Sequence, residues 1–292
     1  MKSSRTENIY HFILNAFMLL LAFMTLYPFW HVLMYAISDP KAAMQGGLFL
    51  LPKGFSLTSI QLLLESHGIY EAYGNSIFRL VVGTVINVVF TAMLAYPLAI
   101  RRFVGRNQIT LMVFFTMLFS GGMIPNYLLI RSLGMTDTLW ALIIPSAISA
   151  WNLLIMKTYF QTIPAEIEES ASIDGSTPTR TLFTIILPIS MPVIAAIALF
   201  YGVYHWNSYF DAILYIHSQD NEVLQVFLRR MLMQSSLQQL SGSDGYSISQ
   251  ATVTEESVKM ATVVASVLPM LLIYPFLQKY YVKGVMIGSV KG

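Results

Sequence analysis

The residues of this sequence that could do chemistry are carboxylates in one short polar stretch. Glu168, Glu169 and Asp174 gather in the run EESASIDGSTPTRTLFTIILP, which extends from 168 to 188. Carboxylates in such a segment can receive Lys or Arg side chains of another protein through charge-assisted hydrogen bonds. Gly175 follows them directly and can take a left-handed turn. The chemistry that this pattern favours is the binding of a partner.

Signatures of catalysis are absent from the sequence. There is no cysteine, and the five histidines form no H-E-x-x-H pair. Neither a G-x-S-x-G elbow nor a G-x-x-x-x-G-K-[ST] phosphate loop occurs. We therefore expect no catalytic residue, no metal site and no cofactor in this chain.

The amino-acid composition indicates whether the chain is surrounded by water or by lipid. Of 292 residues 55% are hydrophobic and 11% charged, against about a quarter charged in soluble domains. The net charge of +2 gives no basic face for nucleic acid. The sequence predicts an all-α integral membrane protein with lipid around it, and no nucleic-acid partner.

Stretches of about 20 apolar residues, long enough to cross a bilayer, occur six times. We predict one transmembrane domain over 1–292, with a polar region at 161–184 between the fourth and fifth spans and long outer loops at 38–70 and 205–258. The predicted spans lie near 12–37, 75–100, 109–130, 138–160, 185–204 and 260–281.

Basic residues set the orientation of these spans. An even number of spans places both termini on one side, and ten Lys and Arg lie on that side against five in the opposite loops. Positive charge marks the cytoplasmic side, so we expect cytoplasmic termini and a cytoplasmic 161–184 region. The ten are Lys2, Arg5, Arg101, Arg102, Arg106, Lys157, Arg180, Lys279, Lys283 and Lys291; the five are Lys41, Lys53, Arg131, Arg229 and Arg230. Arg79 and Lys259, at outer span ends, are expected to snorkel toward water and to have no function.

The 161–184 region predicts two short helices that meet at a glycine. Pro164 suits the first turn of an amphipathic helix, and Ile167 and Ala171 lie on one stripe of it. Gly175 ends this helix, and Thr177 with Pro178 forms the cap and first position of the next. We expect the second helix to continue into the 185–204 span and to act as a lever on it.

The same stretch resembles the EAA coupling motif of ABC importer permeases, in which Glu-Ala-Ala, a glycine and Ile-x-Leu-Pro recur at fixed spacing. Ser170 departs from the pattern because it replaces the first alanine, a small-for-small change. The flanking PAEIEESASIDG and the terminal QKYYVKGVMIGSVKG resemble the carbohydrate-uptake branch, in particular the smaller maltose-type permease. The residues at motif spacing are Glu169, Ser170, Ala171, Gly175, Ile185, Leu187 and Pro188.

This resemblance implies a fold like that of type I ABC importer permeases, in the cytoplasmic (inner) membrane. It also implies a second permease subunit as heterodimer partner, two ATPase subunits that bind ATP and Mg, an extracytoplasmic solute-binding protein and a saccharide substrate. The residues expected to couple to the ATPase are Glu168, Glu169, Ser170, Ala171, Asp174, Gly175, Ile185, Leu187 and Pro188, with apolar area from Ile167 and Ile173.

An aromatic cluster near the end of the fifth span is a candidate substrate pathway, since sugars are held by aromatic faces and hydrogen bonds. The residues are Tyr201, Tyr204, Trp206, Asn207 and Tyr209. The alternative is an interfacial aromatic belt, which needs no substrate. We also expect helix breaks at Gly121, Gly122 and Pro125 and at Tyr96-Pro97, the latter inside the second span.

The substrate is expected to be an oligo- or polysaccharide, such as alginate, because the sequence is similar to importers of larger saccharides. Ten of the fifteen acidic residues lie on the predicted outer side and would repel a polyuronate, so neutral oligosaccharides stay open. Two other classes also stay open: an ion-driven secondary transporter, and a membrane scaffold that recruits a cytoplasmic partner.

Overall fold

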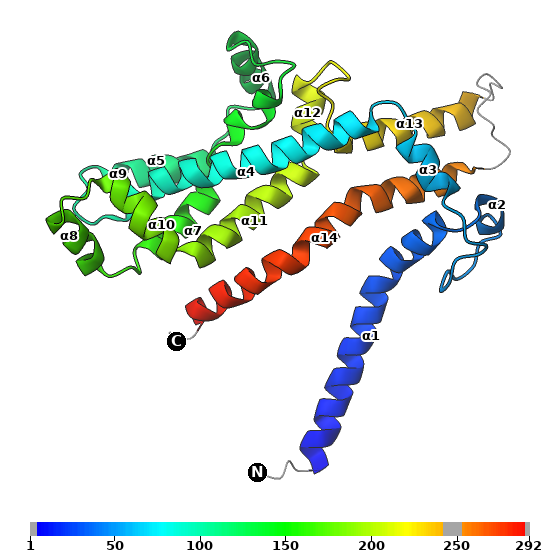
Figure 1. Ribbon diagram of the computed structural model, residues 1–292, viewed down its shortest axis with the longest axis horizontal. Coiled ribbons are helices and arrows are strands. Elements are labelled where there is room, and N and C mark those ends of the chain that lie inside the picture. Colours follow the sequence, from blue (N-terminus) through cyan, green and yellow to red (C-terminus); the bar gives the residue numbers. More distant parts are fainter. Residues whose placement is uncertain (1–4, 242–252, 290–292) are drawn as a thin grey trace. The chain divides into compact units, whose positions relative to one another are not determined.

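The computed structural model describes residues 5–241 and 253–289, and their side chains over 9–233 and 253–272. Every regular element in these residues is helical, and β pairing is limited to one isolated bridge between Ser38 and Phe55. The chain divides into two compact units, which are described separately. The all-α expectation is confirmed (Figure 1).

Unit 1 comprises 1–69 and 228–269. Its core is small and aromatic: Tyr35 and Phe49 pack together with ring centroids 5.0 Å apart, beside Ala43. Asp39 caps the short second helix, accepting from the amides of Lys41 and Ala42. Its elements are α1 (Arg5–Ala36), α2 (Pro40–Ala43), α3 (Thr58–Leu64), most of α13 (Leu224–Ser241) and the first part of α14 (Glu255–Ser289).

Unit 2 comprises 70–227 and 270–292 and contains both regions expected to function. Its main core joins α4, α7, the 182–186 turn and α11 through buried Ala95, Met156, Ile186 and Ile197. The elements are α4 (Ile69–Ala99), α5 (Arg106–Leu118), α6 (Met123–Ser132), the 3₁₀ turns η1 (Leu139–Leu142) and η2 (Ile144–Ser146), α7 (Ala150–Phe160), α8 (Ala165–Ile173), α9 (Pro178–Thr181), the π-helical turn η3 (Leu182–Ile186), α10 (Leu187–Ile189), α11 (Met191–Asn207) and α12 (Phe210–Tyr215).

Among the described residues, two helical stretches are long and apolar enough to cross a membrane, 9–36 and 69–99. Three bent pairs of helices reach the same criterion when each is taken as one unit: α5 with α6, the 139–146 turns with α7, and the 178–189 leg with α11. Their bends are 115°, 48° and 89°. The predicted sixth span, 260–281, lies in α14 and extends beyond the residues whose side chains are described.

Glycine accounts for the sharpest of these bends. The predicted span 109–130 is two helices, because α5 ends at Leu118 and Gly122 adopts φ +89° before α6 begins (Figure 1). Pro125 then lies in the first turn of α6, where a missing N–H costs no helical bond. The expected break at Gly121, Gly122 and Pro125 is confirmed.

Two other local predictions are wrong. Tyr96-Pro97 does not break α4, which continues to Ala99; Pro97 lies in its last turn, and Ala95 and Leu98 are fully buried in the core. The outer region 205–258 is not one loop either, since it contains α12 and α13, and α13 includes the first half of the polar tract at 234–250. Leu, Gln and Met in 224–241 are good helix formers and outweigh its polar composition.

Candidate functional site: a coupling corner and a buried polar network

The first candidate site is the corner formed by α8 and α9. Gly175 has φ +74°, and the amides of Gly175 and Ser176 donate to the carbonyls of Ser172 and Ala171 at 3.1 and 2.9 Å. These two bonds are the Schellman pattern of a helix end, which requires the left-handed residue. Thr177 then caps α9 through the amide of Arg180. Both predicted helix boundaries at this corner are confirmed.

The four carboxylates of the corner differ in their surroundings. Glu168 pairs with Arg102 at 3.1 Å, and the two side chains are 25% and 68% exposed. Arg102 follows α4, so this ion pair joins α8 to the end of the longest helix of unit 2. Glu166, Glu169 and Asp174 are exposed. The corner therefore presents three carboxylates to solvent and uses Glu168 in an internal ion pair.

The apolar residues of α8 separate into an inner and an outer side. Ala171 is 5% exposed and packs inside the unit, so its side chain cannot form part of a partner's docking area as expected. Ile173 is 87% exposed, and Ile167 is half-buried. Helical geometry explains this split, because residues two apart point to different faces. Ser170 is exposed, in keeping with a small residue at the surface.

A cavity of about 630 Å³ lies between α8 and the segment that follows α4. Charged groups of both signs line it, together with Tyr96 and Ile186 of the core. The cavity thus lies beside the Arg102–Glu168 ion pair, on the side of α8 that carries Glu168 and Glu169. The charged lining residues are Arg101, Arg102, Arg106, Glu168 and Glu169.

The lever expected from 178 to 204 is not continuous. The 178–189 leg meets α11 at 89°, and the corner lies at Ser190, which is fully buried. Leu187 belongs to the first leg and Pro188 is exposed on it, while Ile185 is half-buried. Pro192 in the first turn of α11 suits a new helix start. The prediction of a single 185–204 helix is wrong.

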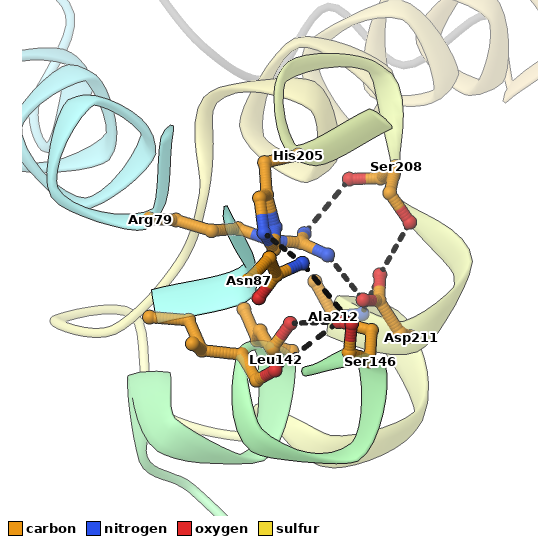
Figure 2. A network of polar contacts seen from close by, with 9 residues as sticks. Arg79, Asn87, Leu142, Ser146, His205, Ser208, Asp211 and Ala212 are labelled. Carbon is orange, nitrogen blue, oxygen red and sulfur yellow. Dashed lines mark hydrogen bonds and ion pairs between the residues drawn. The ribbon is translucent and has the colours of Figure 1, made fainter. Parts of the chain in front are cut away.

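The second candidate site is a buried polar network built on one face of α4. Arg79 is fully buried, its Nη1 donates to the carbonyl of Ser208 at 3.0 Å, and its Nη2 pairs with Asp211 (Figure 2). Asp211 also accepts from the hydroxyl of Ser208 at 3.0 Å and the amide of Ala212 at 2.9 Å. The expected snorkelling of Arg79 toward water is wrong, because its side chain is fully buried. Its guanidinium ties α4 to the segment that joins α11 and α12.

Asn87 continues the network two turns further along α4. Its amide nitrogen donates to the carbonyl of Ser146 at 3.0 Å and lies 3.2 Å from His205 Nε2 (Figure 2). Because the Ser146 carbonyl accepts only, the amide nitrogen must face it, which leaves His205 Nε2 as the acceptor. Gly83 lies beneath this ring, since a Cβ there would be 2.5 Å from His205 Nε2.

Thr91 completes the face with a third contact. Its hydroxyl lies 2.7 Å from the Tyr201 hydroxyl, which also accepts from the amide of Ser149 at 2.9 Å. Arg79, Gly83, Asn87 and Thr91 recur every four residues and therefore share one helical face. This spacing was the available sequence signal, and it was missed because the partners lie far away in the chain.

The expected aromatic pathway does not form one surface. Tyr201 and Trp206 are buried at 2% exposure, whereas Tyr204 and Tyr209 are 45% and 40% exposed. Asn207 is exposed, and its amide donates to the Val203 carbonyl of its own helix. The 100° step of α11 turns neighbouring residues to opposite sides. Tyr201 and Tyr204 both line a cavity described below, and Tyr204 is the exposed one of the two.

A third polar feature joins two loops of unit 2. Asp137 has φ +60°, and its Oδ1 accepts from the amides of His217 and Ser218 at 3.0 and 2.9 Å and from the Ser218 hydroxyl at 2.9 Å. Its carbonyl accepts from Asn221. These donors stabilise the ionised form and lower the pKa of Asp137. The backbone strain at Asp137 is compensated by this set of hydrogen bonds.

Comparisons with known proteins agree with this architecture. Residues 67–287 match the family described as "Binding-protein-dependent transport system inner membrane component". The polygalacturonan/rhamnogalacturonan transport system permease protein YtcP of Bacillus subtilis (strain 168) is 40% identical over 286 residues, 98% of this chain and 99% of that protein. Protein LplC of the same strain is 44% identical over 268 residues, 92% and 90% of the two chains.

A solved structure extends the likeness to three dimensions. The crystal structure of a bacterial ABC transporter involved in the import of the acidic polysaccharide alginate contains a chain that matches with a TM-score of 0.87 and 30% identity. The match covers 96% of this chain and 99% of that chain.

The chain therefore belongs to the family of binding-protein-dependent inner-membrane transport components. Its fold is that of a type I ABC permease, and it is a multi-pass protein of the inner membrane. It is the permease subunit of a binding-protein-dependent ABC transport system, and the ATPase is a separate subunit. The expected permease family and the expected lack of enzyme activity are confirmed, and the secondary-transporter alternative is set aside.

Proposed function

We propose that the 164–188 region is the element through which a partner ATPase drives this permease. Two connections inside unit 2 support the proposal. Arg102 and Glu168 join α8 to the end of α4, and Leu182 and Ile186 bury the following turn in the core with α7 and α11. A displacement of α8 would thus reach three of the helices that form the core. The arrangement is a branched linkage rather than the straight lever expected from the sequence.

Exposed groups on α8 are the proposed contact with the ATPase. Glu169, Asp174 and Ile173 face solvent and together offer charge and apolar area. Ala171 acts from inside, by packing the helix onto the unit, and Gly175 sets the turn. Ser170, Ile185, Leu187 and Pro188 complete the proposed coupling set.

The proposed topology has six spans with both termini in the cytoplasm, which places α8 on the cytoplasmic side. The excess of Lys and Arg on that side supports the orientation. The proposed assembly adds a second permease, two ATPase subunits that bind ATP and Mg, and an extracytoplasmic binding protein. ATP-driven closure of the ATPases would then switch the permeases between outward and inward access.

The proposed substrate is an acidic polysaccharide or a fragment of one. The names of two similar proteins support it, since one transports polygalacturonan or rhamnogalacturonan and the other is part of an alginate importer. Neutral oligosaccharides are the alternative, supported by the excess of acidic residues on the predicted outer side.

The decisive test compares Gly175→Leu with Gly134→Leu in the purified complex. Gly134 has φ +66°, close to that of Gly175, and a Cβ at either glycine would meet no atom within 4 Å. Both variants therefore carry the same backbone strain. We expect Gly175→Leu to lose ATPase co-purification or the stimulation of ATP turnover by loaded binding protein, and Gly134→Leu to retain ATPase binding. Equal ATPase binding and turnover in the two variants would refute the coupling role.

A further inference from the structure

A second cavity in unit 2 has the composition of a saccharide contact. Its volume is about 510 Å³, within the range of roughly 300–1,000 Å³ found for small-molecule pockets. It lies between the segment that begins α7 and the last turns of α11. Its lining includes Ser146, Ser149, Trp151, Asn152, Phe200 and Tyr204.

Asn152 is the polar group that needs a ligand. The residue is 6% exposed, and among the described residues its side-chain amide makes no hydrogen bond. Its backbone amide alone is bound, by the Ser149 hydroxyl that caps α7. Its nitrogen and oxygen are not enclosed by the protein, because the amide borders the cavity and can be reached from it. Both its N–H donors and its carbonyl acceptor are available there.

Three aromatic residues line the same cavity as this amide. Trp151, Phe200 and Tyr204 are 62%, 40% and 45% exposed and all line the cavity. The C–H face of a pyranose ring is apolar and its edge carries hydroxyls, so a sugar satisfies rings and amide together. A lipid chain would cover the rings and leave the amide without a partner, which is costly at membrane depth.

The neighbouring cavity makes the contrast clear. It shares Trp151 and Phe200, but its other lining residues are mostly apolar, among them Phe114, Met117 and Leu154. That surface suits lipid or a partner helix. Only the cavity of Asn152 adds an unbonded amide to the same two rings.

The polar network of α4 holds this cavity in shape. The Tyr201 hydroxyl bridges Thr91 and the Ser149 amide, and Asn87 binds the carbonyl of Ser146. Both segments that form the cavity are thereby fixed to one helix. Because these segments are already ordered, a bound sugar would lose little affinity to the entropy cost of ordering them. Even a site with few contacts on a transport path could then bind a sugar ring.

We propose that the cavity of Trp151, Asn152 and Tyr204 contacts a sugar ring of the saccharide in transit, the aromatic faces covering its C–H face and the amide binding its hydroxyls. No charged side chain lines the cavity. It therefore recognises the ring and not the carboxylate of a uronate, so discrimination by charge belongs to other parts of the assembly. The inference rests on the proposed import of saccharides and assigns a contact to this chain.

The test uses the full complex in proteoliposomes with loaded binding protein. Uptake of oligogalacturonate, an alginate oligosaccharide and a neutral arabino-oligosaccharide is measured for wild type, Asn152→Leu, Asn152→Asp and Trp151→Leu. Asn15→Leu and Phe17→Leu on α1 are the controls, since both residues are exposed and line neither cavity. Loss of one neutral hydrogen bond predicts a rise in KM of about three- to tenfold for Asn152→Leu, with kcat little changed.

The Asn152→Asp variant separates contact from folding. For an anionic saccharide, repulsion should raise KM further than in Asn152→Leu. For a neutral saccharide, the retained acceptor should make Asn152→Asp the milder variant. A purely structural role for Asn152 would give the same order of the two variants for both kinds of saccharide, and this result would overturn the inference.

Photocrosslinking supplies a readout that does not depend on transport. A diazirine derivative of the imported saccharide should label peptides containing 146–152 or 200–204 during ATP-driven turnover. Labelling only elsewhere, with wild-type KM in Asn152→Leu, would overturn the contact while leaving the importer function intact. Absence of ATP-dependent uptake of all three saccharides by the wild-type complex would instead overturn the proposed function and this inference with it.

Discussion

Two arginine–carboxylate pairs anchor α4 to distant parts of unit 2, and they differ in almost every physical respect. Arg79 and Asp211 form a pair in which the arginine is fully buried and also bound to the Ser208 carbonyl. Arg102 and Glu168 form a pair whose arginine is 68% exposed. A buried ion that loses its partner cannot be hydrated, whereas an exposed one can. The Arg79–Asp211 pair should therefore stay formed throughout a transport cycle, whereas the Arg102–Glu168 pair can open and close.

The largest expected effect tests the buried pair. Asp211→Ala leaves the Arg79 guanidinium buried without its carboxylate. This should lower the free energy of unfolding by about 3–5 kcal/mol, and the yield of folded protein should fall with it. The double variant Arg79→Met with Asp211→Leu should recover most of this loss, because an apolar pair carries no desolvation penalty. Thermal unfolding of the detergent-solubilised complex measures both. A single variant as stable as wild type would contradict the structural role of the pair.

A smaller effect is expected where α4 approaches His205. Gly83→Ala places a Cβ 2.5 Å from the imidazole, and relieving such overpacking should cost about 1–3 kcal/mol. Gly74→Ala in the same helix is the matched control, since its Cβ would meet no atom within 4 Å and helix propensity should make the change favourable by about 0.5–1 kcal/mol. If Gly83→Ala lowers the thermal stability and Gly74→Ala raises it, the close approach of Gly83 to His205 is confirmed. Equal changes in stability for the two variants would exclude that approach. Adding His205→Ala should remove the cost at position 83.

An effect on stability that depends on pH is expected at Asp137, whose carboxylate is bound by neutral donors outside the predicted spans. Its pKa is lowered first by the backbone amides of Ser218 and His217. A lowered folded-state pKa means that the stabilisation is complete above the unfolded value of about 4 and is lost as pH falls through the folded value. The stability difference between wild type and Asp137→Ala should therefore shrink below about pH 4. Hydrogen exchange of the 215–222 segment at several pH values checks this; a difference that grows on acidification would contradict it.

The smallest effect on stability is expected at the exposed pair. Arg102→Ala or Glu168→Gln should change the free energy of unfolding by about 0–1 kcal/mol, less at high salt. If this pair carries movement from α8 to α4, the same variants should lower the ATP turnover that loaded binding protein stimulates. The charge reversal Arg102→Glu with Glu168→Arg should restore it. Unchanged stimulation in both single variants would leave the packing of 182–186 as the only supported connection.

Local chemistry made the coupling corner predictable. Pro164, Gly175, Thr177 and Pro178 act through their own backbone or that of residues within three positions, so the sequence predicts the helix ends correctly. The same holds for the break at Gly122. The 89° corner at Ser190 also carries a local signal, since Pro188 and Pro192 flank it, but the prediction followed the apolar composition of 185–204 and took the run as one helix.

The sequence by itself determined the membrane environment, the all-helical class, the permease family and the corner at Gly175, because each follows from composition or from neighbours in the chain. Only the tertiary structure decided which polar residues of α4 are paired. Arg79 meets Asp211 132 positions away, and Asn87 meets His205 118 positions away. Such partners are chosen by how helices pack, which no local pattern specifies. For the same reason, only the fold could bring Tyr201 and Tyr204, but not Trp206, to the cavity that the amide of Asn152 borders, and leave Tyr204 the exposed one of the two.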